Sequence, residues 1–292
     1  HLRTTTQVDI DSWAGRILDN GDSAVEVMAS ALQMAADGDI GQDANELETD
    51  VDYLEAFSTH DGIFVDDRSG VIIGAIGLAG SPALNTLMNG LRAKNNIRIT
   101  TTGFMRVRED VESTDKNITL HAIDSARMTL LSQPDGRDEV SALDSDENFD
   151  EDFSVENNAT IKGALSVTLL AGDDMLIDSG TTLTTGADGS TNVNDQIVLR
   201  IDHGDADDNA ATDPQNNPTN TGARFDLLGN VATTSLLITG ERDDDSFYLS
   251  PQSLSGHTRV LGDISDAAGG SDRFVLDHLP TITSKHDRPD HL

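Results

Sequence analysis

The chain contains no cysteine, which excludes a disulfide framework, a thiol nucleophile and a thiolate metal site. Aromatic residues are also scarce, with one Trp, two Tyr and eight Phe among 292 residues. That is too few for a carbohydrate-binding aromatic platform, so core packing is the expected role of Trp13 and the Phe side chains. Stability must come from packing and from ladders of hydrogen bonds, with bound ions as a further source.

Positive charge is scarce too. Lys and Arg number 19 against 52 Asp and Glu, a formal net charge of −33. This balance argues against nucleic acid or an anionic membrane as a partner, since both would be repelled, and favours cations. No apolar run is long enough to span a bilayer, so we expect no direct membrane insertion. The start HLRTTT has neither an initiator Met nor a signal-peptide core, which favours a piece of a longer protein.

Catalytic motifs are missing as well. The sequence has no GxSxG elbow, no HExxH helix, no GxGxxG motif and no P-loop, and its eight His residues are scattered. It therefore indicates no catalytic and no cofactor-binding residue, and we expect a protein that is not an enzyme.

Aspartate is what the chain has in excess, with 41 Asp against 11 Glu. Aspartate favours turns and supplies short, hard oxygen ligands, so the bias indicates many turns and favours bound Ca²⁺. Adaptation to a high-salt habitat would give a similar excess. Composition leaves both explanations open.

A repeat near the end of the chain organises the prediction of the fold. GERDDDSFYL (240–249) and GDISDAAGGSDRFVL (262–276) both carry an acidic, glycine-bearing turn that leads into Asp-x-Phe-x-Leu, and the second copy follows the first after 27 residues. A recurrence of one turn and one short strand at ~20–30 residues is typical of a solenoid, whose coils bury their apolar faces against each other. The repeat predicts stacked β coils.

Earlier segments fit this prediction with alternatives. In 23–41 a helix competes with a strand, and the alternation of apolar residues favours the strand. In 62–74 two short apolar strands flank a polar turn that suits either a hairpin or a solenoid corner. Asn96 and Asn117 each precede a strand, where Asn tolerates left-handed backbone and its amide can stack on the next coil. Val8, Ile10 and Trp13 are expected to line the interior.

Two runs carry a resemblance to a known family. ADGDIGQDANELETDVDYLEA fits GxIGxxxNxLxT through Gly38, Ile40, Gly41, Asn45, Leu47 and Thr49, and GIFVDDRSGVIIG fits GxIxxxxxxGxxIG through Gly62, Ile63, Gly70, Ile73 and Gly74. These runs resemble the repeats of filamentous-haemagglutinin-type giant bacterial surface adhesins. The resemblance implies a right-handed parallel β-helix, an extracellular or cell-surface location for a secreted bacterial protein, and a partner ligand on a host or neighbouring-cell surface.

The expected fold is therefore all-β, a right-handed parallel β-helix (solenoid) with loop excursions. Residues 1–292 form one body, a fragment or repeat unit of a larger protein, with excursions at about 134–152 and 203–222, which are acidic or Asn- and Asp-rich. His-Leu stands at both chain ends, which suits one unit of a tandem array. Open solenoid ends are unpaired edges, so head-to-tail self-association into a fibre would cover them.

Calcium is the sharpest ligand hypothesis. Residues 269–274 weakly resemble the GGxGxDxUx calcium-binding repeats of β-rolls, although the Gly at the fourth place is missing. Solvated Asp turns remain the alternative. The candidate metal ligands are carboxylates in the two glycine-bearing turns and in one further acidic cluster: Asp243, Asp244, Asp245, Asp263, Asp266 and Asp272, then Asp205, Asp207 and Asp208.

Three functions remain open. The first is an extracellular structural protein, either a β-helical segment of a bacterial surface adhesin or the repeating subunit of a cell-surface or matrix filament, stabilised by calcium. The second is a β-helix polysaccharide lyase or glycosidase, which would gather Arg and Lys on one outer face of adjacent coils. The third is a calcium-responsive module of a secreted repeat protein.

Overall fold

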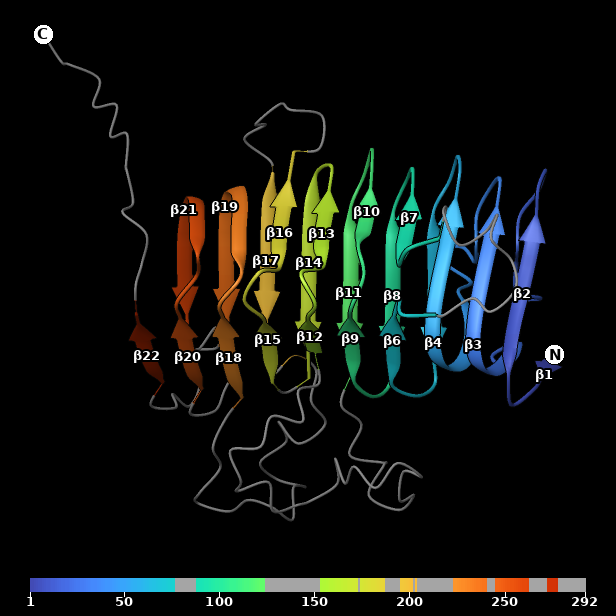
Figure 1. The fold of residues 1–292 in the computed structure, drawn as a ribbon, viewed down its shortest axis with the longest axis horizontal. Coiled ribbons are helices and arrows are strands. Elements are labelled where there is room, and N and C mark those ends of the chain that lie inside the picture. Colours follow the sequence, from blue (N-terminus) through green and yellow to red (C-terminus); the bar gives the residue numbers. More distant parts are fainter. Residues whose placement is uncertain are drawn as a thin grey trace, which may run out of the picture.

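The computed structural model describes residues 1–76, 88–123, 153–172, 174–186, 195–201, 203, 223–240, 245–262 and 272–277. These residues form 22 β-strands and no helix (Figure 1), so the all-β prediction is confirmed. Every pairing between strands is parallel, and the strands stack along one axis. The predicted excursion 134–152 lies outside the described residues, as does all of 203–222 except His203.

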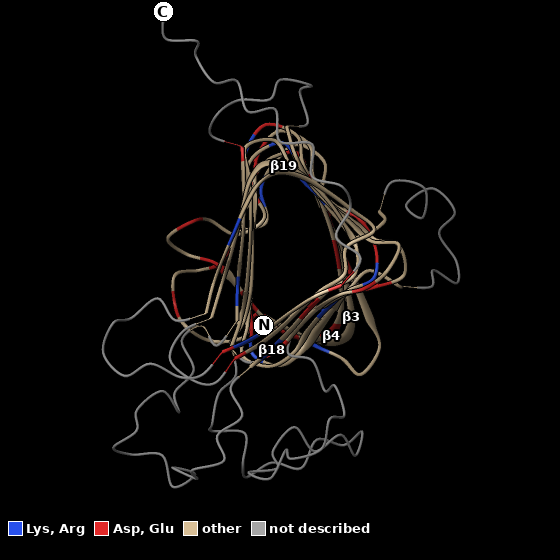
Figure 2. Ribbon diagram, turned by 90° about the vertical axis from the view of Figure 1, so that its left-hand side faces the viewer, with Lys and Arg blue, Asp and Glu red and all other residues tan. Residues whose placement is uncertain are grey.

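The strands line three faces, which Figure 2 shows as the sides of a triangular cross-section. Face 1 begins with β1 (Leu2–Arg3) and the N-terminal ends of β3 (Val27–Ala36) and β4 (Leu47–Ser58). It continues through β5 (Ile63–Asp67), β8 (Ile97–Thr101), β11 (Ile118–Ala122), β14 (Ser166–Ala171), β17 (Gln196–Arg200) and the C-terminal halves of β19 (Asn230–Thr239) and β21 (Ser253–Leu261).

Faces 2 and 3 are built in the same way. Face 2 holds the start of β2 (Gln7–Ser12), the middle of β3 and β4, then β6 (Val71–Ile73), β9 (Met105–Val107), β12 (Phe153–Val155), β15 (Met175–Ile177), β18 (Arg224–Leu227), β20 (Ser246–Leu249) and β22 (Arg273–Leu276). Face 3 holds the ends of β2, β3 and β4, then β7 (Leu91–Ala93), β10 (Val111–Ser113), β13 (Thr160–Gly163), β16 (Thr182–Thr185) and the starts of β19 and β21.

The chain visits the faces in the order 1, 2, 3 and then returns to face 1 one strand further along. We call one such passage a coil. The segment 62–74 is therefore a corner and no hairpin, because β5 pairs with β4 and β8 while β6 pairs with β4 and β9. The strand alternative for 23–41 is also confirmed, since β3 spans Val27–Ala36.

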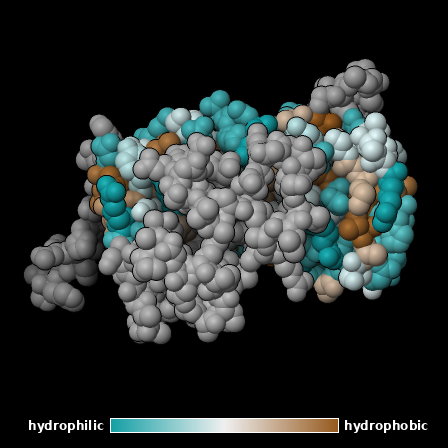
Figure 3. Space-filling view, turned by 90° about the horizontal axis from the view of Figure 1, so that it is seen from below, coloured by the Kyte–Doolittle hydropathy of each residue, from teal (hydrophilic) through white to brown (hydrophobic). Residues whose placement is uncertain are grey.

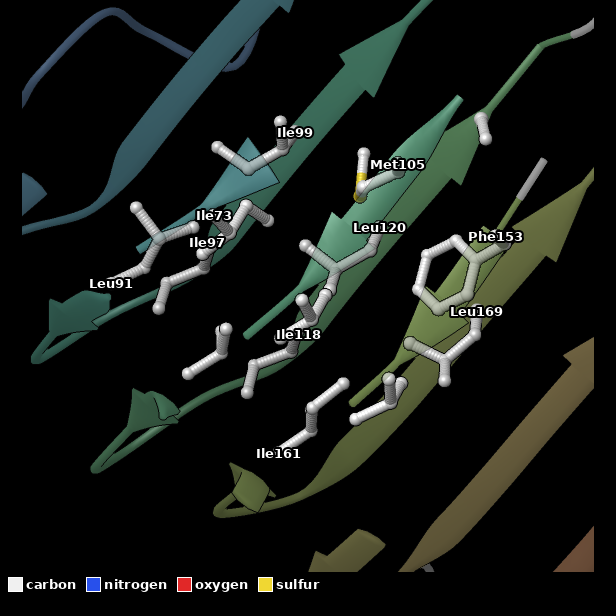
Figure 4. Close-up of a cluster of buried hydrophobic side chains, with 14 of the residues drawn as sticks. Ile73, Leu91, Ile97, Ile99, Met105, Ile118, Leu120, Phe153, Ile161 and Leu169 are labelled. Atoms are coloured by element: carbon white, nitrogen blue, oxygen red, sulfur yellow. The ribbon is translucent and has the colours of Figure 1, made fainter. Parts of the chain in front are cut away.

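Alternation within the strands creates the core. Most short strands show a buried, half-buried, buried pattern, so every second side chain points inward. The inward residues form ladders from coil to coil, and one ladder on face 1 consists of Ile17, Ile40, Ile63, Ile97, Ile118, Val167, Ile197 and Leu236. Figure 4 shows the side chains of this interior meeting between the faces. β-Branched residues suit this site, because they pack well on a pleated surface.

The predicted Asn ladder forms at the corner before face 1. Asn117 donates from its backbone N to Asn96 Oδ1 at 3.3 Å, and its side-chain amide lies 3.4 Å from the same oxygen. Neither residue has a positive φ, so these two asparagines act through their amides and the left-handed backbone is not used there. Trp13 is a correction: Val8 and Ile10 pack against the core, but Trp13 is 75 % exposed.

Candidate functional site

The repeated Asp-x-Phe-x-Leu motif is in register. Phe247 pairs with Phe274 and Leu249 with Leu276, so the 27-residue repeat corresponds to successive coils. Asp245 and Asp272 stand side by side at the corner before face 2, and the backbone N–H of Asp245 donates to Asp272 Oδ1 at 3.3 Å.

Each of these carboxylates also folds back onto a glycine. A Cβ added to Gly240 would overlap the Asp245 carboxylate, and one added to Gly262 would overlap the Asp272 carboxylate. The glycine therefore makes room for the aspartate that begins the next strand. Of the predicted metal ligands, the structure brings these two together, and it gives both a structural role in the corner.

The remaining predicted metal ligands lie outside the described residues. They are Asp243, Asp244, Asp263, Asp266, Asp205, Asp207 and Asp208. Calcium binding at those positions stays a prediction.

A different set of carboxylates converges at the N-terminal end of the stack. Asp19, Glu26 and Glu48, which we call the acidic triad, each place a carboxylate oxygen within 4.8 Å of the others. Asp19 lies in the loop between β2 and β3, Glu26 directly precedes β3, and Glu48 is in β4. Glu26 and Glu48 are neighbours across coils, because the Glu26 N–H donates to the Glu48 carbonyl at 2.9 Å.

The loop that carries Asp19 is shaped by its own short side chains. Gly21 N donates to Asp19 Oδ2 at 2.5 Å, Asp22 N to Asn20 Oδ1 at 3.0 Å, and Ala24 N to Asp22 Oδ1 at 2.8 Å. Gly21 has a φ of 90°, a conformation that glycine adopts without strain. These Asx turns hold the loop over the start of β3 and direct Asp19 toward Glu26 and Glu48.

Electrostatics within the triad are unfavourable. Burial raises the pKa of Glu48 to about 7, and the Asp19 and Glu26 charges add to the effect. Burial also raises the pKa of Glu26, followed by the charge of Asp19. Burial opposes ionisation of Asp19 too, but the backbone N–H groups of Gly21 and Asn20 bring its pKa below the usual 3.8. The triad concentrates negative charge that the glutamates resist carrying.

The triad escaped the sequence-based search because its members are 7 and 22 residues apart. A usable signal exists nonetheless. Ile17, Ile40 and Ile63 are spaced by 23 residues and pair as successive bridges. With that coil length known, Glu26 and Glu48 fall opposite each other.

Basic residues along the stack are paired with carboxylates. Arg92 and Lys162 flank Glu112 on successive coils of face 3, with N–O distances of 3.3 and 3.0 Å. Arg108 pairs with Glu156 at 3.2 Å. These ion pairs lie on the outer surface and join neighbouring coils.

Two histidines that are far apart in the sequence meet in the structure. The rings of His121 and His203 have centroids 5.4 Å apart. Burial lowers the pKa of His121, and His203 contributes to the same effect. Both were expected to be isolated surface or turn residues, and the long sequence gap between coils concealed their proximity.

Two shallow depressions on the surface have volumes of about 130 Å³ each, one beside Trp13 and Phe57 and one beside Arg98 and Phe64. Typical small-molecule sites have ~300–1,000 Å³. Neither depression has the size of an enclosed substrate pocket. The face seen in Figure 3 is mostly hydrophilic where it is coloured, with apolar residues showing among the polar ones toward the N-terminal end on the right.

The fold and these sites define an acidic, all-β protein with solenoid-like stacking of parallel strands. Comparison with protein-family models, with curated proteins and with solved structures gives no match. The likeness to filamentous-haemagglutinin-type repeats therefore depends on the sequence motifs alone. Among the described residues, the structure contains no helix with the length and apolarity needed to cross a membrane.

Proposed function

We propose that this chain is a right-handed parallel β-helical segment of an extracellular structural protein, either a bacterial surface adhesin or the subunit of a cell-surface or matrix filament. The observation that carries the proposal is the continuity of the interior ladders, which run in register from the first coils to β22. A stack of this kind is stiff, because pulling on it loads many parallel hydrogen bonds together.

The end of the stack supports association with a further coil. Phe274 and Leu276 of β22 continue the inward ladders of face 2, yet they are 46 % and 59 % exposed. Apolar side chains and unpaired strand edges at one end favour head-to-tail stacking of a second copy. The acidic corners favour stabilisation by calcium as a further part of the proposal.

The distribution of basic residues favours this structural role over a polysaccharide lyase. A lyase needs an unpaired Arg or Lys beside its substrate, whereas Arg92, Lys162 and Arg108 are each engaged with glutamate. The excess of negative charge would also repel an anionic polysaccharide.

Electron microscopy tests the proposal. We expect rods or filaments with a ~4.8 Å repeat along the axis. Leu276→Asp, which places a charge on the open end, should shorten or abolish filaments while the single coils remain folded. Leu165→Asp is the matched control, because Leu165 is also exposed but lies on the side of the stack. Compact globular particles from the unmodified chain would refute the structural role.

A further inference from the structure

Four oxygens of the acidic triad lack any hydrogen-bond donor and have almost no contact with water: Asp19 Oδ1, Glu26 Oε1, Glu26 Oε2 and Glu48 Oε2. Glu48 is only 9 % exposed and its carboxylate is directed at the other two. An ionised carboxylate buried without a donor is costly, so buried charges are paired or coordinate metals. Three of them converging on one point call for a positive charge at that point.

We propose that Asp19, Glu26 and Glu48 form a Ca²⁺ site that ties β3 to β4. Three oxygens that lie within 4.8 Å of one another have a common point about 2.8 Å or less from each. That distance is close to the 2.3–2.6 Å of Ca²⁺–oxygen bonds. Ca²⁺ also accepts irregular sets of carboxylate oxygens, whereas Mg²⁺ demands a near-ideal octahedron at ~2.0–2.1 Å and keeps several waters.

The charged groups around the triad do not supply the missing positive charge. His1 Nδ1 is 3.8 Å from Glu26 Oε1 and is hydrogen-bonded to the Val25 carbonyl at 2.9 Å. Asp22 adds a further negative charge that raises the pKa of Glu26 after burial and Asp19. Among the described residues, no Lys or Arg forms an ion pair with Asp19, Glu26 or Glu48.

The next carboxylate in the same column shows the contrast. Asp66 pairs with Glu48 in the sheet register, and Arg68 lies 3.6 Å from its Oδ2. The Arg68 guanidinium also donates to the Ser23 carbonyl at 3.1 Å, in the loop that carries Asp19. The chain thus supplies an arginine for Asp66 and leaves the triad to an external cation. Bound Ca²⁺ would fix this loop and the first coils, whatever larger role the stack has.

Thermal unfolding and calorimetric titration of the full chain test the site. After EDTA treatment, Ca²⁺ should raise the melting temperature more than Mg²⁺ at equal concentration, with NaCl held constant. Glu48→Gln should lower the Ca²⁺ affinity of this site at least ~10-fold, because it removes one charged ligand. In EDTA the same variant should melt at or above the unmodified chain, since it also removes like-charge repulsion.

The reversal of order between EDTA and Ca²⁺ is the decisive result. Asp52→Asn is the matched control, since Asp52 is an exposed carboxylate on the same strand, and it should leave the Ca²⁺ response unchanged. An equal Ca²⁺ response of Glu48→Gln and the unmodified chain would place any calcium elsewhere and overturn the proposal. Equal shifts with Ca²⁺ and Mg²⁺ would overturn it as well.

Discussion

Asp67 is a carboxylate in the interior of the stack. It is fully buried, and it occupies the inward ladder of face 1 between Thr49 and Thr101. Its Oδ2 accepts hydrogen bonds from Thr49 Oγ1 at 2.7 Å and Val51 N at 3.1 Å, and its Oδ1 accepts from Ser69 N and Ser69 Oγ, both at 2.9 Å. These donors favour the charged form, but burial outweighs them and raises the pKa of Asp67 to about 7.

A pH-dependent stability follows from this shift. Between the usual pKa of 3.8 and about 7 the folded chain holds a proton that the unfolded chain has lost, so stability falls as the pH rises through this window. The loss attributable to Asp67 is on the order of 4 kcal/mol. Asp67→Asn should be less stable than the unmodified chain at pH 5, because Ser69 N loses its acceptor, and the difference should shrink by pH 8.

Urea unfolding at pH 5, 6, 7 and 8 measures that difference. Comparing the variant with the unmodified chain cancels the titration of Glu48 and Glu55, whose pKa values burial also raises to about 7. Two parallel stability curves for the variant and the unmodified chain would show that Asp67 does not titrate in this range.

Individual residues were the least predictable part of the molecule. The role of Asp67 inside the core has no sequence signature, since Asp66 and Asp67 form one acidic pair and only the register decides which of them points inward. Trp13 was expected inside because of its size, yet it ends beyond β2, where the strand no longer directs side chains alternately to the core. Both outcomes depend on strand ends, which local composition does not define.

At the scale of the strand ladder, face 2 carries a row of large, soft side chains. Met105, Phe153, Met175, Phe225, Phe247 and Phe274 pair in register across six coils. The rings of Phe247 and Phe274 are stacked with centroids 5.0 Å apart, and Phe225 and Phe247 are tilted at 6.4 Å. Such pairs contribute beyond the area that they bury.

The ladder predicts unequal costs for the same substitution. Phe247→Ala should lower the free energy of unfolding by about 3–5 kcal/mol, because Phe247 is 1 % exposed and truncation leaves a cavity between two rings. Phe274→Ala should cost clearly less, since half of that ring is already exposed at the end of the stack. Urea denaturation followed by circular dichroism measures both, and equal costs would argue that β22 is covered in solution.

Strand ladders were predictable where one coil follows the last without a long excursion. Asn96 and Asn117 are 21 residues apart, the two Asp-x-Phe-x-Leu copies are 27 apart, and each pair proved to be adjacent. Ile118 and Val167 also pair, but 49 residues separate them, and no periodicity survives such an insertion. The fold class was therefore predictable from short coils, whereas the full register needed the structure.

At the scale of the whole molecule, the stack repeats like charges from coil to coil. Glu26, Glu48 and Asp66 are successive members of one outward column on face 1, and neighbouring strands are ~4.8 Å apart. With a net charge of −33, repulsion opposes the compact state along the entire body. The cross-coil ion pairs around Glu112 oppose this repulsion only locally.

Added monovalent salt should therefore stabilise the chain. The screening length falls from ~30 Å at 0.01 M to ~3 Å at 1 M, which is below the spacing between coils, so repulsion among the carboxylates weakens more than the partly buried ion pairs do. We expect the melting temperature in EDTA to rise steadily as NaCl increases over this range. Differential scanning calorimetry measures the change, with EDTA excluding any contribution from divalent ions. A melting temperature that falls with NaCl would mean that ion pairs such as Arg92–Glu112–Lys162 outweigh the net charge, and that the acidity of the surface is compensated within the stack itself.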